Sequence, residues 1–454
     1  MKNICSKLSA REDFPQKSLL FLSFVLMLVL QIRLLNAGLF WDDDKYIFQN
    51  DVIRLGRSPL LFWGREVTST SWPVFYSLMW ALFQLFGLRY ALYHCVNLLF
   101  HSLNGYLMYR IAVKARLPIP ALPAAFFWLH PVTFETAAWI MQFSKILTLT
   151  CLLVWCLLYL SSPERISRNF LPLYTACLCS AQPLLILISQ IFVEFLALGG
   201  WRRLLSLGIQ TTLAGYAVFL VVMGATVHYE STIVRLPALP PPAVSAPAAV
   251  PPPAIPAPAV TPPPAISAPA ATRTSVSEYI AKSALGAGAT YGDKLEEWKQ
   301  KLTHVGQSSL FYFLRIFFPS PQKMPVRQET VDALPLSPWA AVALGALMLL
   351  LSIFTLYKRN LFLNLALLSY LPISGIVFIP FQAVFPVADR YLYIPLAFIL
   401  LFLCKLPREG GKKWWLALSL LCLLPLSYQS FERARYLDKL FHMPLLSMYW
   451  DVEP

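Results

Sequence analysis

Residues 19–46 read LLFLSFVLMLVLQIRLLNAGLFWDDDKY, an apolar stretch that leads into the acidic run Asp42-Asp43-Asp44. Between Leu19 and Leu35, only Gln31 and Arg33 are strongly polar. A stretch of this length suits a helix that crosses a bilayer. Three carboxylates at a membrane boundary repel one another. They therefore indicate either a functional site with a metal, a cation or a reacting proton, or a solvated stop after the span.

The composition extends this reading to the whole chain. Of the 454 residues, 57% are hydrophobic and 13% are charged, about half the charged fraction of water-soluble proteins. Apolar stretches near twenty residues recur, which predicts an all-α polytopic membrane protein. The formal net charge of +14 indicates membrane topology and contact with anionic lipids. No segment resembles a nucleic-acid-binding element, so we expect no nucleic-acid partner.

The hydropathy pattern predicts about eleven transmembrane helices. A stretch as long as 170–200 would make one helix of about 45 Å, too long for a hydrocarbon core of about 30 Å, so we divide it near Gln182-Pro183. Residues 72–88 are expected to form a helix that lies in the outer interface. The predicted spans are 18–36, 90–112, 119–134, 145–160, 170–182, 184–200, 204–226, 338–357, 361–380, 391–405 and 414–428.

Short basic clusters predict the orientation of these spans. Lys2, Lys7, Arg11 and Lys17 precede the first span, so the N-terminus is expected in the cytoplasm. Each later cluster is separated from the one before it by an even number of predicted crossings. This places the basic clusters on the cytoplasmic side and the acidic run on the opposite side.

This topology divides the chain into four regions. Residues 1–230 are expected to form an N-terminal transmembrane module with an outer acidic loop at 37–90. Residues 231–275 are rich in Pro and Ala, which predicts an extended disordered linker outside the cytoplasm; we favour an inert spacer over a recognition motif. Residues 276–335 should form an outer amphipathic segment with a short helix at 278–302. Residues 336–454 complete the bundle and its short outer tail.

The second predicted span carries a stripe of polar side chains. His94, Asn97, His101 and Asn104 lie on one helical face at offsets of three, seven and ten. A polar stripe in lipid must face protein or a water-filled cavity. For the two asparagines we favour hydrogen bonds between helices. His94 lies near the outer end, where it can reach a site.

Three further outer segments carry charge. Glu135, Trp139 and Lys145 follow His130-Pro131 in an expected ordered loop, where they either join the acidic run or form a structural salt bridge. Arg390 has neighbouring tyrosines, and Arg315 lies among aromatic residues. Arginines in such surroundings indicate a bound anion, and phosphate matches the geometry of the guanidinium group. The combination suits transfer from a lipid-anchored phosphate: a carboxylate takes a proton from an acceptor hydroxyl, and basic groups stabilise the departing phosphate.

Five motifs in order resemble those of the C-type (GT-C) glycosyltransferases, most closely the transmembrane-and-tetratricopeptide O-mannosyltransferases and their bacterial relatives. The most specific is Ala388-Asp389-Arg390-Tyr391-x-Tyr393-x-Pro395. The others are Asp42-Asp43 with Ile47, Asn50, Asp51 and Val52; Tyr93-His94-x-x-Asn97-Leu98-Leu99-x-His101; His130-Pro131-x-x-x-Glu135-x-x-Ala138-Trp139-Ile140; and Tyr370-Leu371-Pro372-Ile373-Ser374-Gly375.

The resemblance implies a GT-C-type bundle, a lipid-phosphate-linked sugar donor, an outer-face active site and inversion at the anomeric carbon. The expected catalytic residues are Asp42, Asp43 and Glu135. A divalent metal, Mg or Mn, held by Asp42 and Asp43 is left open. The residues expected to bind donor phosphate or substrate are Arg390, Arg315, Lys145, His94, His130, Trp139, Tyr391 and Tyr393.

The chain also departs from the pattern. Phe143 stands where the family often has an arginine, and Ser180-Ala181 replaces a Ser-Lys pair. Lys145, Arg315 and Arg390 are expected to compensate for these two missing cations. The tetratricopeptide repeats do not occur in the sequence, and the Pro-rich insertion is new.

The sequence therefore predicts an inverting glycosyltransferase of a bacterial inner membrane. It would move a sugar from a polyprenyl-phosphate donor to a hydroxyl of a protein, such as a pilin or a secreted protein, or of a glycan or lipid, on the periplasmic face. One alternative is a transporter or flippase of lipid-linked sugars. The charged residues gather at one face rather than at mid-membrane, which favours the enzyme. The other alternative is a polysaccharide polymerase or ligase.

Overall fold

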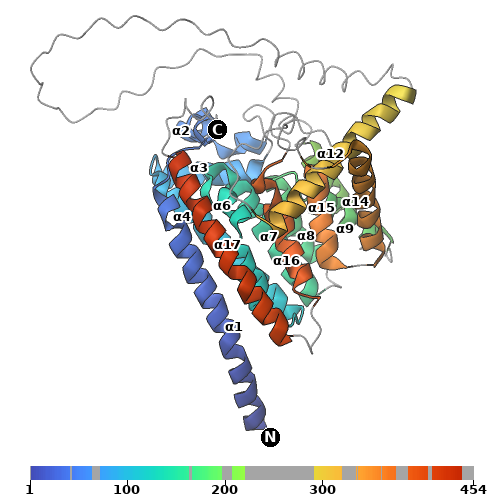
Figure 1. Cartoon of the computed structure of the whole chain (residues 1–454). Coiled ribbons are helices and arrows are strands. Elements are labelled where there is room, and N and C mark those ends of the chain that lie inside the picture. Colours follow the sequence, from blue (N-terminus) through green and yellow to red (C-terminus); the bar gives the residue numbers. More distant parts are fainter. Residues whose placement is uncertain are drawn as a thin grey trace, which may run out of the picture. The chain divides into compact units, whose positions relative to one another are not determined.

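The computed structural model describes residues 2–40, 43–63, 72–162, 166–196, 207–219, 291–319, 334, 336–358, 360–374, 387–406 and 412–441. This part of the chain is helical and holds no strand, which confirms the all-α fold class (Figure 1). The helices are α1 (Lys2–Gln31), α2 (Asp51–Arg54), α3 (Pro73–Phe86), α4 (Tyr90–Lys114), α5 (Ala121–Leu129), α6 (Pro131–Ala138), α7 (Phe143–Ser161), α8 (Ile166–Cys179), α9 (Leu184–Leu196), α12 (Tyr291–Phe317), α14 (Pro338–Lys358), α15 (Leu361–Tyr370), α16 (Asp389–Leu403) and α17 (Lys412–Phe441).

Contacts divide the chain into a unit of residues 1–228 and 298–454 and a unit of residues 229–297. Of the second unit, only the first turns of α12 are described. The linker predicted at 231–275 and the helix start predicted at 278 lie outside the described residues. The contacts between helices that position the charged residues all lie within the first unit.

Two described stretches are long and apolar enough to cross a membrane, Pro15–Asn36 and Ile140–Ser161. The former begins within α1 and continues through a short 3-10 turn, whereas the latter includes α7. The remaining apolar helices are shorter by this measure: Pro73–Phe86, Phe170–Cys179, Leu184–Val193, Leu207–Phe219, Pro338–Ser352 and Leu361–Ile373. The count of eleven spans therefore stays a prediction.

A sharp corner replaces the single span predicted at 119–134. Helix α5 ends at Leu129, His130 is extended (φ −83°, ψ 124°), and α6 begins at Pro131. The proline explains the break, because its ring disfavours helical geometry in the preceding residue. All eight residues of α6 are buried. The segment expected as an ordered outer loop thus contains a short helix in the interior.

The predicted division of residues 170–200 is confirmed. Helix α8 ends at Cys179 and α9 begins at Leu184, with Pro183 at the junction. A proline has no amide hydrogen to donate to the preceding helical turn, so the chain restarts there as a new helix. This junction lies among α8, α9, α15 and α16, because its Gln182 side chain bonds to both later helices.

Helix α12 includes two segments that were predicted separately, the end of the amphipathic helix at 278–302 and the aromatic segment around Arg315. It runs without interruption from Tyr291 to Phe317 and so carries Arg315 in its last turn. Glycines hold it closely against α14: a Cβ atom on Gly306 would lie 1.9 Å from the Ala341 carbonyl oxygen, and one on Gly345 would lie 2.3 Å from that of Leu302. This close crossing fixes where Arg315 enters the interior.

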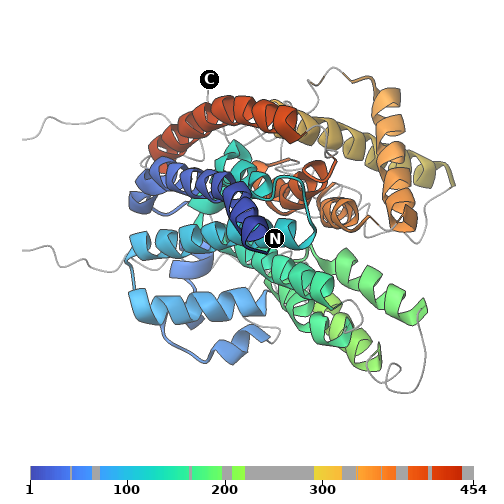
Figure 2. The ribbon, with the colours of Figure 1, turned by 90° about the horizontal axis from the view of Figure 1, so that it is seen from below.

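Helix α17 is longer than the predicted span of 414–428. It continues to Phe441 and packs along α1 and across the α5–α6 corner (Figures 1 and 2). Its second half buries Ser430, Arg433, Ala434 and Leu437, which share one face at helical spacing. The Ser430 hydroxyl donates to the Leu129 carbonyl oxygen at 2.7 Å, at the end of α5. The helix continues beyond the predicted span because this half is amphipathic and has a lower mean hydropathy.

Candidate functional site

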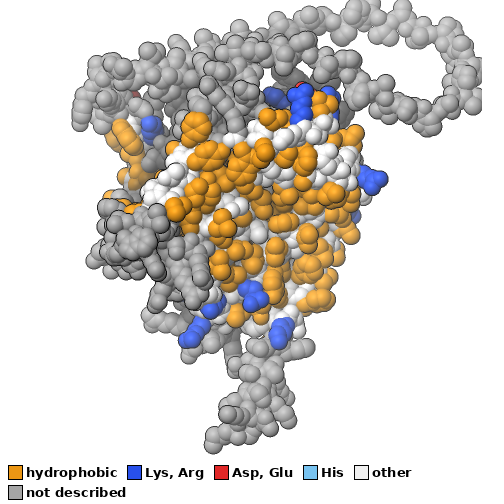
Figure 3. Space-filling view, turned by 180° about the vertical axis from the view of Figure 1, so that it is seen from behind, with side chains coloured by type: hydrophobic (Ala, Val, Ile, Leu, Met, Phe, Trp, Pro, Cys, Tyr) orange, Lys and Arg blue, Asp and Glu red, His pale blue; other side chains and the backbone are white. Residues whose placement is uncertain are grey.

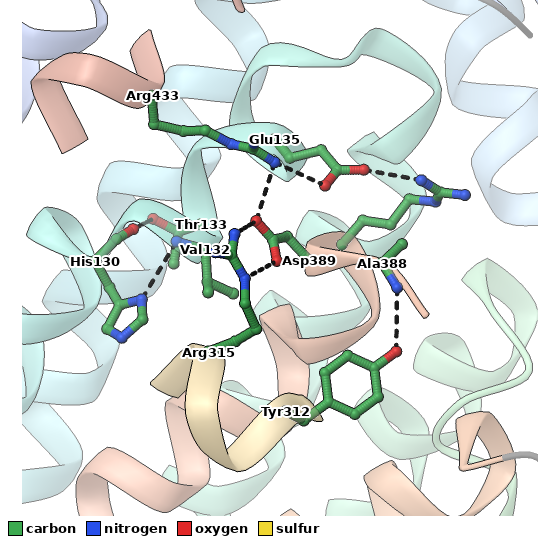
Figure 4. Close-up of polar contacts among 10 residues, drawn as sticks. His130, Val132, Thr133, Glu135, Tyr312, Arg315, Ala388, Asp389 and Arg433 are labelled. Atoms are coloured by element: carbon green, nitrogen blue, oxygen red, sulfur yellow. Dashed lines mark hydrogen bonds and ion pairs between the residues drawn. The ribbon is translucent and has the colours of Figure 1, made fainter. Parts of the chain in front are cut away.

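Two carboxylates and three arginines from four helices form a buried ion cluster, which we define as Glu135, Arg315, Asp389, Arg390 and Arg433. Figure 4 shows the Arg315 and Arg433 side chains converging on the Asp389 carboxylate. Arg315 binds Asp389 in a bidentate manner, with Nε 2.9 Å from Oδ1 and Nη2 on Oδ2. Arg433 Nη2 lies 3.0 Å from Asp389 Oδ2 and 3.6 Å from Glu135 Oε2. Arg390 Nη1 lies 2.8 Å from Glu135 Oε1.

Helix ends and neighbouring charges stabilise this cluster. Asp389 lies in the first turn of α16 and Arg315 in the last turn of α12, where the helix dipoles favour their respective charges. Burial raises the pKa of Asp389, but the guanidinium groups of Arg315 and Arg433 outweigh it and hold that pKa below its usual range. Because the folded-state pKa is lowered, this contribution to stability is present above the ordinary pKa of aspartate. It is lost as the pH falls through the lowered value.

A second group of cations adjoins the cluster around the ring of Tyr391. Lys145 Nζ lies 5.1 Å and the Arg390 guanidinium carbon 5.0 Å from the centroid of this ring. Arg390 has the carboxylate of Glu135, whereas Lys145 Nζ donates to the neutral Gln142 Oε1 at 2.8 Å. No described carboxylate forms an ion pair with Lys145. When every group is ionised, the ion cluster and Lys145 together comprise four cations and two carboxylates.

The structure describes two residues of the acidic run, Asp43 and Asp44, and their environments differ. Asp42 lies outside the described residues. Asp43 is fully buried, and its carboxylate accepts hydrogen bonds from the amides of Phe40 at 3.1 Å and Met141 at 2.7 Å. Asp44 is partly exposed and accepts from Gln49 Nε2 at 2.5 Å; burial raises its pKa and this hydrogen bond opposes the rise. Asp43 therefore anchors the acidic loop to the chain that leads into α7.

Substituting Asp43 by asparagine is expected to loosen this anchor. One of the two carboxylate oxygens becomes an amide group that cannot accept a hydrogen bond, so a buried backbone donor loses its partner at a cost of about 1–3 kcal/mol. Thermal unfolding of the detergent-solubilised protein measures the loss. Asp44→Asn is the matched control, since it lies beside Asp43 but is partly exposed. Equal midpoints for the two variants would contradict the anchoring role.

Trp139 connects the acidic loop to the ion cluster. Its ring packs edge-on against Phe40 with centroids 5.0 Å apart, and the Arg390 guanidinium carbon lies 5.0 Å from its centroid. Its carbonyl oxygen accepts from Asn97 Nδ2 at 2.9 Å. Trp139 thus contacts three segments that are far apart in the sequence, two through its indole and one through its carbonyl oxygen.

The polar stripe of α4 faces the interior, as its spacing predicted. Asn97 and Asn104 donate to backbone carbonyls of the α6–α7 region, which confirms the expected hydrogen bonds between elements. His94 Nε2 lies 3.0 Å from the Ala37 carbonyl oxygen. His101 Nδ1 lies 2.9 Å from the Tyr393 hydroxyl, which also accepts from Asn104 at 3.3 Å. His94 and Tyr393, both expected at the substrate, thus join elements of the bundle.

His130 has a local structural role as well. Its Nδ1 accepts from the amide of Val132 at 3.3 Å and so caps α6, while Nε2 lies 3.0 Å from the Ile316 carbonyl oxygen of α12. With Nδ1 as an acceptor, Nε2 is the nitrogen that donates. His130 therefore links the corner to the helix that carries Arg315.

The described His, Cys, Asp and Glu side chains form no group of three or more that could hold a metal ion. Asp42 does not belong to this set, so the metal left open at Asp42 and Asp43 is neither supported nor opposed.

Three residues of the site were missing from the expected site residues. Asp389 lies inside the most specific quoted motif, so that motif contained the signal. Gln142 lies three residues before Lys145, at the spacing of one helical turn. The helical spacing of residues 430–437 could have indicated a buried face that includes Arg433. Its position against α6, however, depends on how α17 packs in the tertiary structure.

Comparisons with protein families, with curated proteins and with solved structures found no match to this chain.

Proposed function

We propose that this chain is a polytopic inner-membrane glycosyltransferase that inverts the configuration of a sugar carried by a polyprenyl phosphate. The acceptor is a hydroxyl of a protein, glycan or lipid on the periplasmic side. The motif resemblance to GT-C enzymes supports this proposal, and so do the buried charges that these motifs bring together.

The membrane part of the proposal is supported by the surface. Apolar side chains cover much of the face in Figure 3, and Lys and Arg gather toward its margins. Large hydrophobic residues are exposed on several helices, among them Phe21, Leu99, Leu171, Leu350 and Leu424. Soluble monomers seldom expose apolar patches of more than a few hundred Å². A lipid environment removes this surface from water.

The observation that carries the proposed chemistry is the excess of positive charge beside Tyr391. Lys145 and Arg390 share contact with one ring, although like charges at close range in a poorly hydrated interior repel each other. An anion would relieve the repulsion, and a phosphate offers several acceptor oxygens to an ammonium and a guanidinium group. This favours the donor phosphate as the occupant.

Each catalytic role falls to a named residue. Asp42 takes the proton from the acceptor hydroxyl, whose oxygen forms the new bond to the anomeric carbon. The bond from that carbon to the phosphate oxygen breaks, and its electron pair leaves with the polyprenyl phosphate. Lys145 and Arg390 stabilise the negative charge that develops on this leaving group. Asp43 holds the loop in place.

The remaining charged groups act as positioning residues. Glu135 orients Arg390 by the 2.8 Å ion pair and is itself approached by Arg433. Arg315 and Asp389 join α12 to α16. Glu135 is therefore assigned to holding the arginine rather than to proton transfer.

The decisive experiment is an assay of the purified protein in liposomes with synthetic polyprenyl-phosphate mannose, glucose, galactose and arabinose, each labelled in the sugar. We expect one donor to lose its sugar, with release of polyprenyl phosphate, when total periplasmic extract supplies the acceptor. Asp42→Asn is the inactive control. Movement of an intact donor across the bilayer without bond cleavage would instead establish the transporter alternative.

A further inference from the structure

The junction between α8 and α9 holds a buried amide with one unused acceptor. Gln182 is 4% exposed, and its Oε1 has no hydrogen-bond partner. Its Nε2 donates to the carbonyl oxygens of Tyr391 at 3.1 Å and Ser369 at 3.3 Å. The backbone amide of Gln182 donates to Ser180 Oγ at 3.3 Å, so the residue is held at both ends.

The two carbonyl partners fix the orientation of this amide. Exchanging Nε2 and Oε1 would place an oxygen against two carbonyl oxygens, which repels. The unused atom is therefore the acceptor. A buried acceptor without a partner costs free energy, and a ligand that supplies a donor would recover this cost.

The neighbourhood indicates which ligand this is. Gln182 binds the carbonyl oxygen of Tyr391, and the ring of the same residue contacts Lys145 and Arg390. These are the cations assigned above to the donor phosphate. In a lipid-phosphate sugar, the ring hydroxyls lie within a few bonds of that phosphate. A neutral amide oxygen suits a hydroxyl and adds no charge that would oppose the phosphate.

We propose that Gln182 Oε1 accepts a hydrogen bond from a ring hydroxyl of the donor sugar and thereby determines which sugar is transferred. This inference rests on the proposed function. It goes beyond it in assigning the choice of sugar to the helix junction of residues 180–183, a segment apart from the charged groups.

The test compares Gln182→Met with the unchanged protein. Methionine keeps the length of the side chain but offers neither the acceptor nor the amide donors. The measured quantity is kcat/KM for the preferred donor and for its monodeoxy analogues, each lacking one ring hydroxyl. We expect the unchanged protein to discriminate by about tenfold or more against one analogue. In the variant this ratio should fall toward one, while the ratios for the other analogues persist.

Controls separate this effect from misfolding and from failure of the proposed function. Gln190→Met makes the same change at a buried position on α9 and should leave every ratio unchanged. Binding of sugar-free polyprenyl phosphate should be equal in all three proteins. If the unchanged protein neither cleaves a donor nor binds sugar-free polyprenyl phosphate, the proposed function fails and this inference fails with it.

Three results would overturn the inference alone. In the first, donor cleavage occurs, but the unchanged protein has the same kcat/KM for all monodeoxy donors. This result does not depend on the folding of any variant. In the second, Gln182→Met keeps the full set of donor ratios. In the third, the variant alters only the choice among acceptors, which would assign the amide to the acceptor hydroxyl.

Discussion

Replacing Arg433 by methionine is expected to destabilise the protein by about 3–5 kcal/mol, the usual cost of removing one partner from a buried ion pair. Arg433 Nη2 contacts both Asp389 and Glu135, so its loss removes the cation shared by the two buried carboxylates. Methionine approximates the length of the side chain and limits the effect of a cavity. Thermal unfolding in detergent measures the loss as a lower midpoint.

The chain provides a matched control on the same helix. Arg435 is exposed two residues further along α17, so Arg435→Met should change the midpoint little. A double variant with Glu135→Gln should not recover the loss, because Glu135 still pairs with Arg390 when Arg433 is absent, and its replacement removes a second buried ion pair. If Arg433→Met unfolds at the same temperature as Arg435→Met, the cluster does not stabilise the fold.

The second large effect is expected for Lys145→Met, this time on transfer rather than on folding. Loss of the ammonium group removes one of the two cations assigned to the leaving phosphate, and we expect kcat/KM to fall by about 10²–10³-fold, the scale of losing one charge-stabilising donor. The unfolding midpoint should not fall correspondingly, because the burial of the Lys145 ammonium group and its repulsion by Arg390 outweigh its attraction to Glu135. Release of polyprenyl phosphate measures the rate.

Two comparisons make the result specific. Lys114→Met changes an exposed lysine at the end of α4 and should retain full transfer. Lys145→Arg keeps the charge and should recover part of the activity. Full transfer by Lys145→Met at normal protein level would remove this residue from the phosphate site. A loss of transfer that only accompanies a loss of folded protein would assign it to stability instead.

Much of the helical arrangement was predictable because its causes are local. The break at residues 180–183 arises from a proline inside an apolar stretch that is too long for one span. The inward face of α4 arises from four polar residues at helical spacing. The course of α12 was missed because residues 303–317 carry enough apolar side chains to resemble a separate segment, and the end of α17 was missed because amphipathic turns have low mean hydropathy.

By itself, the sequence determined the all-α class, the positions of several helix ends and the residue types available for binding an anion. Each depends on neighbours within a few turns of the same chain. Only the tertiary structure decided how those residues are used. It placed Asp43 against the amide of Met141, His130 against the carbonyl oxygen of Ile316 and Tyr393 against His101, and it brought Arg433 to Glu135 and Asp389. Several of these assignments join side chains that lie hundreds of residues apart in the sequence, whose approach is set by helix packing rather than by spacing along the chain.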